Sequence, residues 1–99
     1  MNFKQENEFT VNSSSLKDIR NFARDLFEKV EELNDYKEEL VLALAEAAQN
    51  IVKHAYKNQP TDDLLKVVIN YNDKTLMMEL FDKGNAAIPE NIKPRNLED

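Results

Sequence analysis

The chain begins with alternating apolar and polar residues and then changes to a helical repeat. In residues 7–11, "NEFTV", Phe9 and Val11 fall on one side, and Glu8 and Thr10 fall on the other. This alternation predicts a short, half-buried strand. From Leu16 to Leu33, apolar residues recur every three or four positions, with charges between them. The repeat predicts an amphipathic helix of roughly 18 residues.

Helix signals surround this segment. The preceding "NSSS" offers Ser14 or Ser15 as an N-cap, and Asp18 is placed to complete a capping arrangement. A second helix is predicted from Tyr36 to Tyr56. It has to end before Pro60, which cannot continue a helix.

The second half of the chain predicts a β-hairpin followed by an irregular loop. "LLKVVINY" (64–71) and "TLMMELF" (75–81) are β-type runs separated by "NDK". After them the periodicity ends, so residues 82–99 are expected to be irregular. The order strand, helix, helix, strand, strand within one domain (1–99) indicates an α+β sandwich with helices on one face of a sheet.

Composition narrows the possible classes of protein. Hydrophobic residues make up 41% of the chain and charged residues 32%, as in ordinary globular domains. There is no Cys, no apolar run of membrane-spanning length and no signal-peptide layout at the start, so the cytoplasm is the simplest location. A net charge of −6 argues against direct binding to nucleic acid or to an anionic membrane.

A row of polar residues runs along the second predicted helix. Glu46, Asn50 and His54 recur at every fourth position between apolar residues. On a helical wheel centred on Leu40, the row starts at the edge of the buried face and moves into it. Small neighbours such as Ala47 leave space beside it, so we expect the row to form the wall of a pocket. A solvated asparagine and a structural histidine are the alternative interpretations.

A second group of candidate residues ends the hairpin, in "FDKG". Asp82 continues the apolar series of Met78 and Leu80, so its carboxylate is expected to face the helices if the strand extends that far. Gly84 permits close backbone approach or a positive φ. A simple turn is the alternative, because Asp and Gly are common turn residues.

Taken together, "EAAQNIVKHAY" (46–56) and "DKG" (82–84) resemble the two nucleotide-binding boxes of the GHKL ATPase superfamily. The "ExxxNxxxHAY" form is similar to the bacterial anti-sigma regulatory factors, which are serine kinases. The resemblance covers nearly the whole chain. It implies a histidine-kinase-like two-layer sandwich, with helices on one face of a mixed, mainly antiparallel sheet. Ala86 departs from the second glycine of the family's "DxGxG" box, and the ATP lid and last elements are expected to be missing after "PRNLED".

The resemblance also implies a role for each candidate residue. Asn50 would hold Mg²⁺ through its amide oxygen, and Glu46 would act as the general base on an attacking serine hydroxyl. His54 would lie near the phosphates of ATP. Asp82 would accept a hydrogen bond from the adenine amino group, and Gly84 would let the backbone pass close to the nucleotide.

The function implied is that of an ATP-binding anti-sigma-type regulator. It would phosphorylate a serine on an antagonist protein and control a partner by switching, with a sigma factor and an anti-anti-sigma antagonist as protein partners. A homodimer is compatible with this assignment. One alternative is a non-catalytic partner-switching module with a degenerate or incomplete nucleotide site. Another is a structural interaction domain whose boxes are coincidental.

Overall fold

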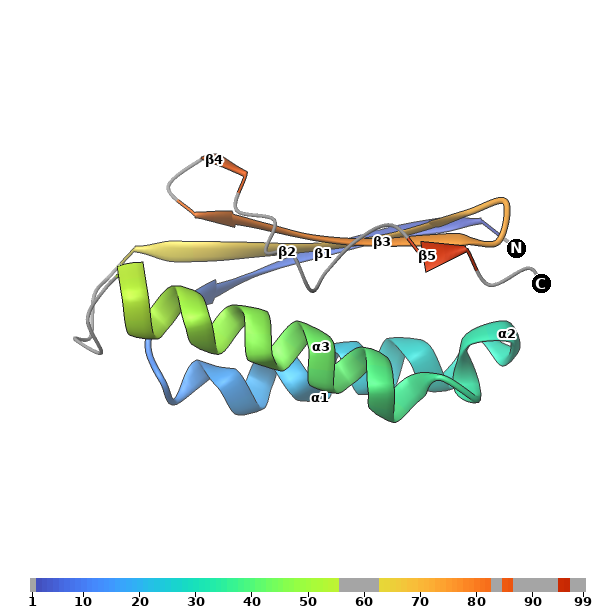
Figure 1. Cartoon of the computed structure of the whole chain (residues 1–99), viewed down its shortest axis with the longest axis horizontal. Helices are drawn as coiled ribbons and strands as arrows, with labels where there is room; N and C mark the ends of the chain where they lie inside the picture. The colour runs from blue at the N-terminus through green and yellow to red at the C-terminus, as the bar shows by residue number, and fades with distance from the viewer. Residues whose placement is uncertain (1, 56–62, 83–84, 87–94, 97–99) are drawn as a thin grey trace.

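Helices and a sheet form two layers in the computed structural model, which describes residues 2–55, 63–82, 85–86 and 95–96 (Figure 1). All helices lie on one face of the sheet, so the predicted α+β sandwich is confirmed. In chain order, the elements are β1 (Phe3–Thr10), α1 (Ser15–Glu28), α2 (Glu31–Asn34), α3 (Lys37–Asn50), the π-helix η1 (Ile51–Ala55), β2 (Leu64–Asn72), β3 (Thr75–Asp82), β4 (Asn85–Ala86) and β5 (Arg95–Asn96).

The sheet is antiparallel at every described pairing, in the order β1-β2-β3-β4, with β5 also paired to β3. The hairpin prediction is confirmed, with a two-residue turn between β2 and β3. Asp73 and Lys74 in this turn have φ values of 51° and 63°. Two consecutive positive φ angles define the type I′ turn, whose twist matches that of the flanking strands.

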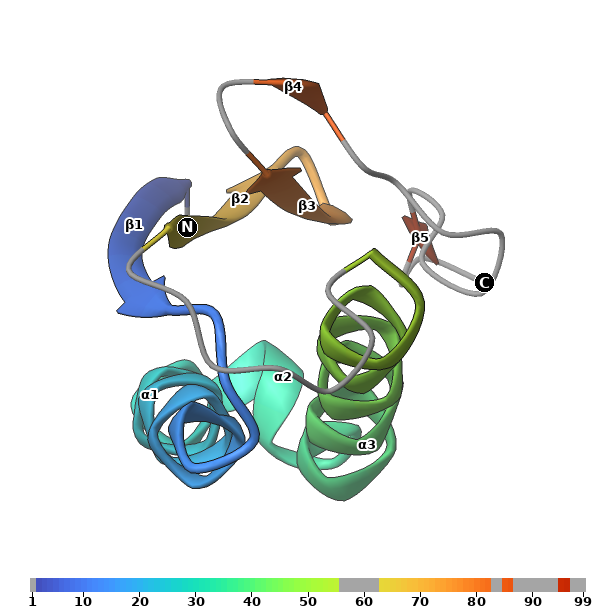
Figure 2. The ribbon, with the colours of Figure 1, turned by 90° about the vertical axis from the view of Figure 1, so that its left-hand side faces the viewer.

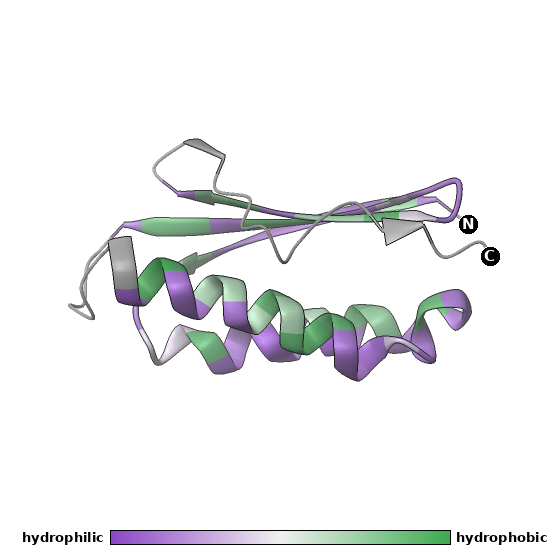
Figure 3. Ribbon diagram, in the orientation of Figure 1, coloured by the Kyte–Doolittle hydropathy of each residue, from purple (hydrophilic) through white to green (hydrophobic). Residues whose placement is uncertain are grey.

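The hydrophobic core lies between the helices and the inner face of the sheet. Both layers contain many apolar residues (green in Figure 3), and those of the helices and strands that are buried form one core cluster. Alternate residues of each strand point inward, as the period of two requires. The core includes Leu65, Val67, Ile69 and Tyr71 of β2, Leu76, Met78 and Leu80 of β3, and Ile19, Phe27, Leu33, Leu40 and Leu44 of the helices.

The first predicted helix is divided in two, although its sequence contains no Gly or Pro. Val30 adopts an extended conformation (φ −111°, ψ 108°) between α1 and α2. Both Val30 and Leu33 are buried in the core. The break therefore lets these two side chains enter the core, and tertiary packing overrides the continuous helical repeat.

The start of α1 is capped by a different residue from the predicted ones. Ser14 occupies the N-cap position but has helical backbone angles and makes no side-chain cap. Instead, Asn12 Oδ1 accepts hydrogen bonds from the Ser15 backbone N–H at 3.0 Å and from the hydroxyls of Ser14 and Ser15. Asn favours this local bond to a backbone N–H further along the chain.

Three further boundaries differ from the prediction. β1 begins at Phe3, four residues before the predicted start. The prediction missed this part of the strand because Gln5 and Asn7 occupy inward positions, where polar side chains hide the alternation. The second helix changes after Asn50 into the π-helical turn η1, which is described as far as Ala55, and the predicted last residue, Tyr56, lies outside the described residues. The segment 82–99, expected to be irregular, contains the end of β3 together with β4 and β5.

Candidate functional site

Glu46 and Asn50 lie on the exposed side of α3. The buried residues of α3 are Leu40, Val41, Leu44, Ala45, Ala47 and Ala48. At 100° per residue these positions centre about 60° from Leu40, which places Glu46 about 180° from the middle of the buried face. The expectation that the row begins at the edge of the buried face is therefore wrong. Because Val41, Ala45 and Ala48 are also buried, the centre of the buried face lies farther from the row of Glu46 and Asn50 than expected.

The π-helical turn η1 begins directly after Asn50. A π-helical turn contains more residues than an α-helical turn, so a spacing of four no longer keeps side chains in one row. Ile51 and Val52 are buried and hold the turn against the core, whereas Lys53 is exposed. The backbone of His54 lies in η1, and its side chain lies outside the described residues. Single π-helical turns within helices are frequent at functional sites.

Asp82 is the last residue of β3 and is half-buried. It shares strand parity with Leu80 and pairs with Leu65, and both of these are buried in the core. The expectation that Asp82 lies on the helix-facing side is therefore confirmed. Asn85 of β4 is its partner on the other flank of β3. Gly84 lies outside the described residues.

The fold brings the ends of α3 and β3 to the same end of the sandwich. In Figure 1, the last turns of α3 and the last residues of β3 both lie at the left, and Figure 2 shows α3 beneath the β3 side of the sheet. Two segments far apart in sequence therefore place Asn50 and Asp82 at one end of the molecule. We call this end, defined by Glu46, Asn50, the η1 turn and Asp82, the α3–β3 end.

The chemistry of these residues fits a magnesium nucleotide. The amide oxygen of Asn50 is a hard ligand, and its exposed position leaves it accessible. Mg²⁺ usually takes one or two protein oxygens and completes its shell with phosphates and water. A half-buried carboxylate such as that of Asp82 can accept a hydrogen bond from an amino group.

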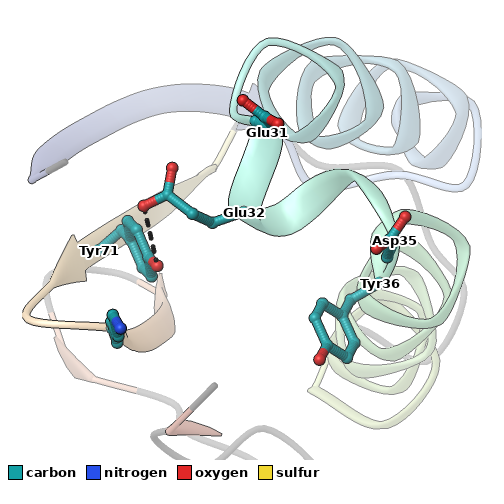
Figure 4. A pocket seen from close by; sticks show the side chains of 6 residues that line it. Glu31, Glu32, Asp35, Tyr36 and Tyr71 are labelled. Carbon is teal, nitrogen blue, oxygen red and sulfur yellow. Dashed lines mark hydrogen bonds between the residues drawn. The ribbon is translucent and has the colours of Figure 1, made fainter. Parts of the chain in front are cut away.

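The opposite end of the sandwich carries a hollow of about 410 Å³ (Figure 4). Its lining residues are Glu31, Glu32, Asp35, Tyr36, Tyr71 and Lys74. Within it, the Tyr71 hydroxyl donates a 3.4 Å hydrogen bond to Glu32 Oε2. Burial raises the pKa of Tyr71, and the charge and hydrogen bond of Glu32 raise it further. Within the described part of the chain, no cluster of three His, Cys, Asp or Glu side chains could hold a metal ion.

Sequence reasoning did not single out this Tyr71–Glu32 contact. A signal was present, because Tyr71 shares strand parity with Val67 and Ile69. A buried tyrosine usually needs a partner for its hydroxyl. The pattern does not identify that partner, since Glu32 is one of several acidic residues in the helical region.

Comparison with protein families assigns the chain to a class. The family model for the histidine kinase-like ATPase domain matches residues 9–99, so the chain belongs to this family. Membership implies ATP as the ligand. No curated protein matches the chain. Among the described residues, no helix has the length and apolar character needed to cross a bilayer.

Proposed function

We propose that the protein binds Mg–ATP at the α3–β3 end and transfers the terminal phosphate to a serine of an antagonist protein. It would thereby regulate a sigma factor in the manner of the anti-sigma factors that its sequence resembles. The observation that carries this proposal is the placement of Asn50 and Asp82 at one end of a histidine kinase-like ATPase domain.

Asn50 is the proposed metal ligand. Its side chain is exposed at the end of α3, where an amide oxygen remains available to a cation that also binds phosphate. The chain carries a net charge of −6, so an anionic nucleotide needs compensation by cations. A bound Mg²⁺ would neutralise charge on the phosphates.

Asp82 is the proposed determinant of base selection. Its carboxylate lies on the helix-facing side of β3 and can accept a hydrogen bond from the amino group of adenine. Guanine presents a carbonyl at the corresponding position. Its oxygen and the Asp82 carboxylate are both hydrogen-bond acceptors, so the two groups would repel each other. His54 in η1 is proposed to lie near the phosphates. Gly84, which follows β3, is proposed to let the backbone pass close to the nucleotide.

Glu46 is the proposed general base. It precedes Asn50 by one helical turn, about 6 Å along the axis of α3. Its exposed position suits a macromolecular substrate, because the serine of another protein must reach it from outside. A carboxylate in this position would orient the hydroxyl and take up its proton.

The same exposure of Glu46 supports a second candidate function, the non-catalytic partner-switching module. Bases in active sites are usually tuned by burial or by neighbouring charges, and Glu46 points away from the core of its own chain. In this second function the protein would bind ATP and its partner without transferring phosphate.

Phosphate transfer separates the two functions. Under single-turnover conditions, labelled ATP would be mixed with the protein and its antagonist, and transfer to serine would be followed over time. We expect Glu46→Ala to reduce transfer by about 10²–10⁴-fold while nucleotide affinity is retained. Gln49→Ala, an exposed neighbour on α3, is the matched control and should transfer phosphate normally.

Two outcomes would contradict the kinase assignment. Equal transfer by the wild-type protein and Glu46→Ala would exclude Glu46 as the base. Wild-type protein that binds both ATP and the antagonist but transfers no phosphate would establish the binding module.

A further inference from the structure

The exposed side of α3 carries one large apolar side chain, that of Leu42, which is 58% exposed. The structure describes every residue of α3, and the other exposed residues of this helix are Glu38, Glu39, Glu46, Gln49 and Asn50. Leu42 belongs neither to the core cluster nor to the half-buried apolar residues that pack against it. The packing of the described core therefore does not account for a leucine at this position.

Leu42 lies one helical turn before Glu46. Four residues of an α-helix rise about 6 Å along the axis and turn about 40° around it. Glu46 lies opposite the middle of the buried face, so both side chains lie on the same exposed side of α3. Leu42, Glu46 and Asn50 thus follow one another along this side. The proposed base has the proposed metal ligand on one side of it and an exposed leucine on the other.

The distance between Leu42 and Glu46 matches the spacing of side chains in an extended substrate segment. Alternate side chains of such a segment point to the same side, about 7 Å apart. The rise between Glu46 and Leu42 is about 6 Å. When a serine lies at Glu46 and the segment runs along α3, the side chain two positions from the serine reaches Leu42. A segment that crossed α3 would leave Leu42 in water, so burial of this leucine favours the first arrangement.

We propose that Leu42 is a specificity-determining residue, which contacts an apolar side chain two positions from the target serine. This role rests on the proposed kinase function, because it takes Glu46 as the base that receives the serine. The substrate class is thereby narrowed to serines with an apolar residue at this distance. A carboxylate at the same position would gain nothing from Leu42. It would also lie beside Glu39 and Glu46, which are three and four residues from Leu42 and are its neighbours on the helix surface.

Peptide substrates test this role. Short synthetic peptides would contain a single serine and either leucine, alanine or aspartate two positions from it on both sides. Phosphate transfer from Mg–ATP would give kcat/KM for each peptide. We expect the wild-type protein to prefer the leucine peptide to the alanine peptide by about tenfold or more. Leu42→Ala should reduce this preference to about twofold or less, mainly through a higher KM for the leucine peptide.

A charged replacement and a matched control sharpen the test. Leu42→Lys should prefer the aspartate peptide to the leucine peptide, because an opposite charge replaces the apolar contact. A residue with a merely structural role would not give this reversal. Leu64→Ala shortens another exposed leucine, on β2, and should keep the wild-type preference. Affinity for Mg–ATP should be the same in all three variants, since Leu42 lies about 12 Å along the axis from Asn50.

Failure of this role and failure of the kinase function give different results. If the wild-type protein phosphorylated the peptides without preferring leucine, or if Leu42→Ala kept the full preference, Leu42 would have no part in substrate selection and the kinase function would stand. Transfer to none of the peptides would also overturn the role of Leu42, since it requires that residues beside the serine suffice for recognition. The kinase function would then still stand if the antagonist protein were phosphorylated, and would fall if it were not.

Discussion

The two ends of the sandwich differ in how they use polar side chains. At the hairpin end, Tyr71 is 1% exposed and its hydroxyl donates a hydrogen bond to Glu32. At the α3–β3 end, Glu46 and Asn50 are exposed on α3. The hairpin end also has a two-residue turn, in which the Asp73 N–H donates to Asn2 Oδ1 at 3.1 Å. The Tyr71–Glu32 bond joins the two layers of the fold, and the Asp73–Asn2 bond holds the turn against the start of β1.

The comparison indicates that one end stabilises the fold and that the other is available for binding. Where polar side chains bond to other parts of the same chain, they specify the fold. Where they are exposed at the end of a helix that continues into a π-helical turn, they remain accessible to a ligand. Substitutions at the hairpin end should therefore change stability, and substitutions at the α3–β3 end should change nucleotide binding.

The largest effect on stability is expected from the core beneath the hairpin end. Leu33 of α2 is fully buried, and we expect Leu33→Ala to lower the free energy of unfolding by about 2–5 kcal/mol. Leu42→Ala is the matched control, because Leu42 is 58% exposed and should change it by no more than about 0.5 kcal/mol. Urea denaturation followed by circular dichroism would measure both. Equal losses would show that Leu33 has no special part in the core.

Asp82→Ala should affect the other end in a different way. In the wild-type protein, guanine would leave the Asp82 carboxylate without a donor, at a cost of about 1–3 kcal/mol. The substitution removes this penalty, so we expect it to reduce the preference for ATP over GTP by about ten- to hundredfold. Competition between the two nucleotides would measure this preference. Asp25→Ala, which removes an exposed carboxylate from α1, should leave the preference unchanged. If the wild-type protein binds ATP and GTP equally well, Asp82 has no part in base selection.

A smaller change is expected from Tyr71→Phe at the hairpin end. Loss of the hydrogen bond to Glu32 should lower the free energy of unfolding by about 0.5–1.5 kcal/mol at neutral pH, without changing nucleotide affinity. Tyr36→Phe is the control, since Tyr36 is partly exposed in the same hollow. If Tyr71→Phe changed nucleotide affinity and Tyr36→Phe did not, the claim that the hairpin end has no part in nucleotide binding would be contradicted.

The pH dependence of the same variant sharpens the test. Burial raises the pKa of Tyr71 in the folded protein above its ordinary value of 10.0, and Glu32 raises it further. The folded state therefore favours the protonated tyrosine. Its contribution to stability is complete below pH 10.0 and is lost as the pH rises through the folded-state pKa. The wild-type protein should thus lose more stability than Tyr71→Phe in alkaline solution, and parallel pH profiles would contradict the assignment.

The repeating patterns of the sequence were sufficient to predict the sandwich but not its breaks. The hairpin was predictable because alternating runs flank a short polar turn, and the helices because their apolar residues recur at helical spacing. The break at Val30 was not, since it depends on how two buried side chains fit a core formed by distant segments. Polar Gln5 and Asn7 likewise hid the first half of β1, which is held by its ladder to β2.

The candidate site was predictable in its residue types more than in its geometry. Strand parity placed Asp82 on the helix-facing side, because the period of two persists to the end of β3. A helical wheel centred on Leu40 places Glu46 too close to the core, because Ala45 and Ala48 are also buried and shift the centre of the buried face. Extrapolation from Asn50 to His54 assumed an α-helix where the chain forms a π-helical turn.

Magnesium-dependent nucleotide binding by Asn50→Ala tests the central claim most directly. Isothermal titration calorimetry would compare ATP binding with and without Mg²⁺ for the wild-type protein, Asn50→Ala and the control Gln49→Ala. We predict that wild type and Gln49→Ala bind ATP more tightly with Mg²⁺, and that Asn50→Ala loses this dependence while its unfolding transition is retained. Equal magnesium-dependent affinities for Asn50→Ala and wild type would contradict the assignment of the α3–β3 end as the Mg–ATP site.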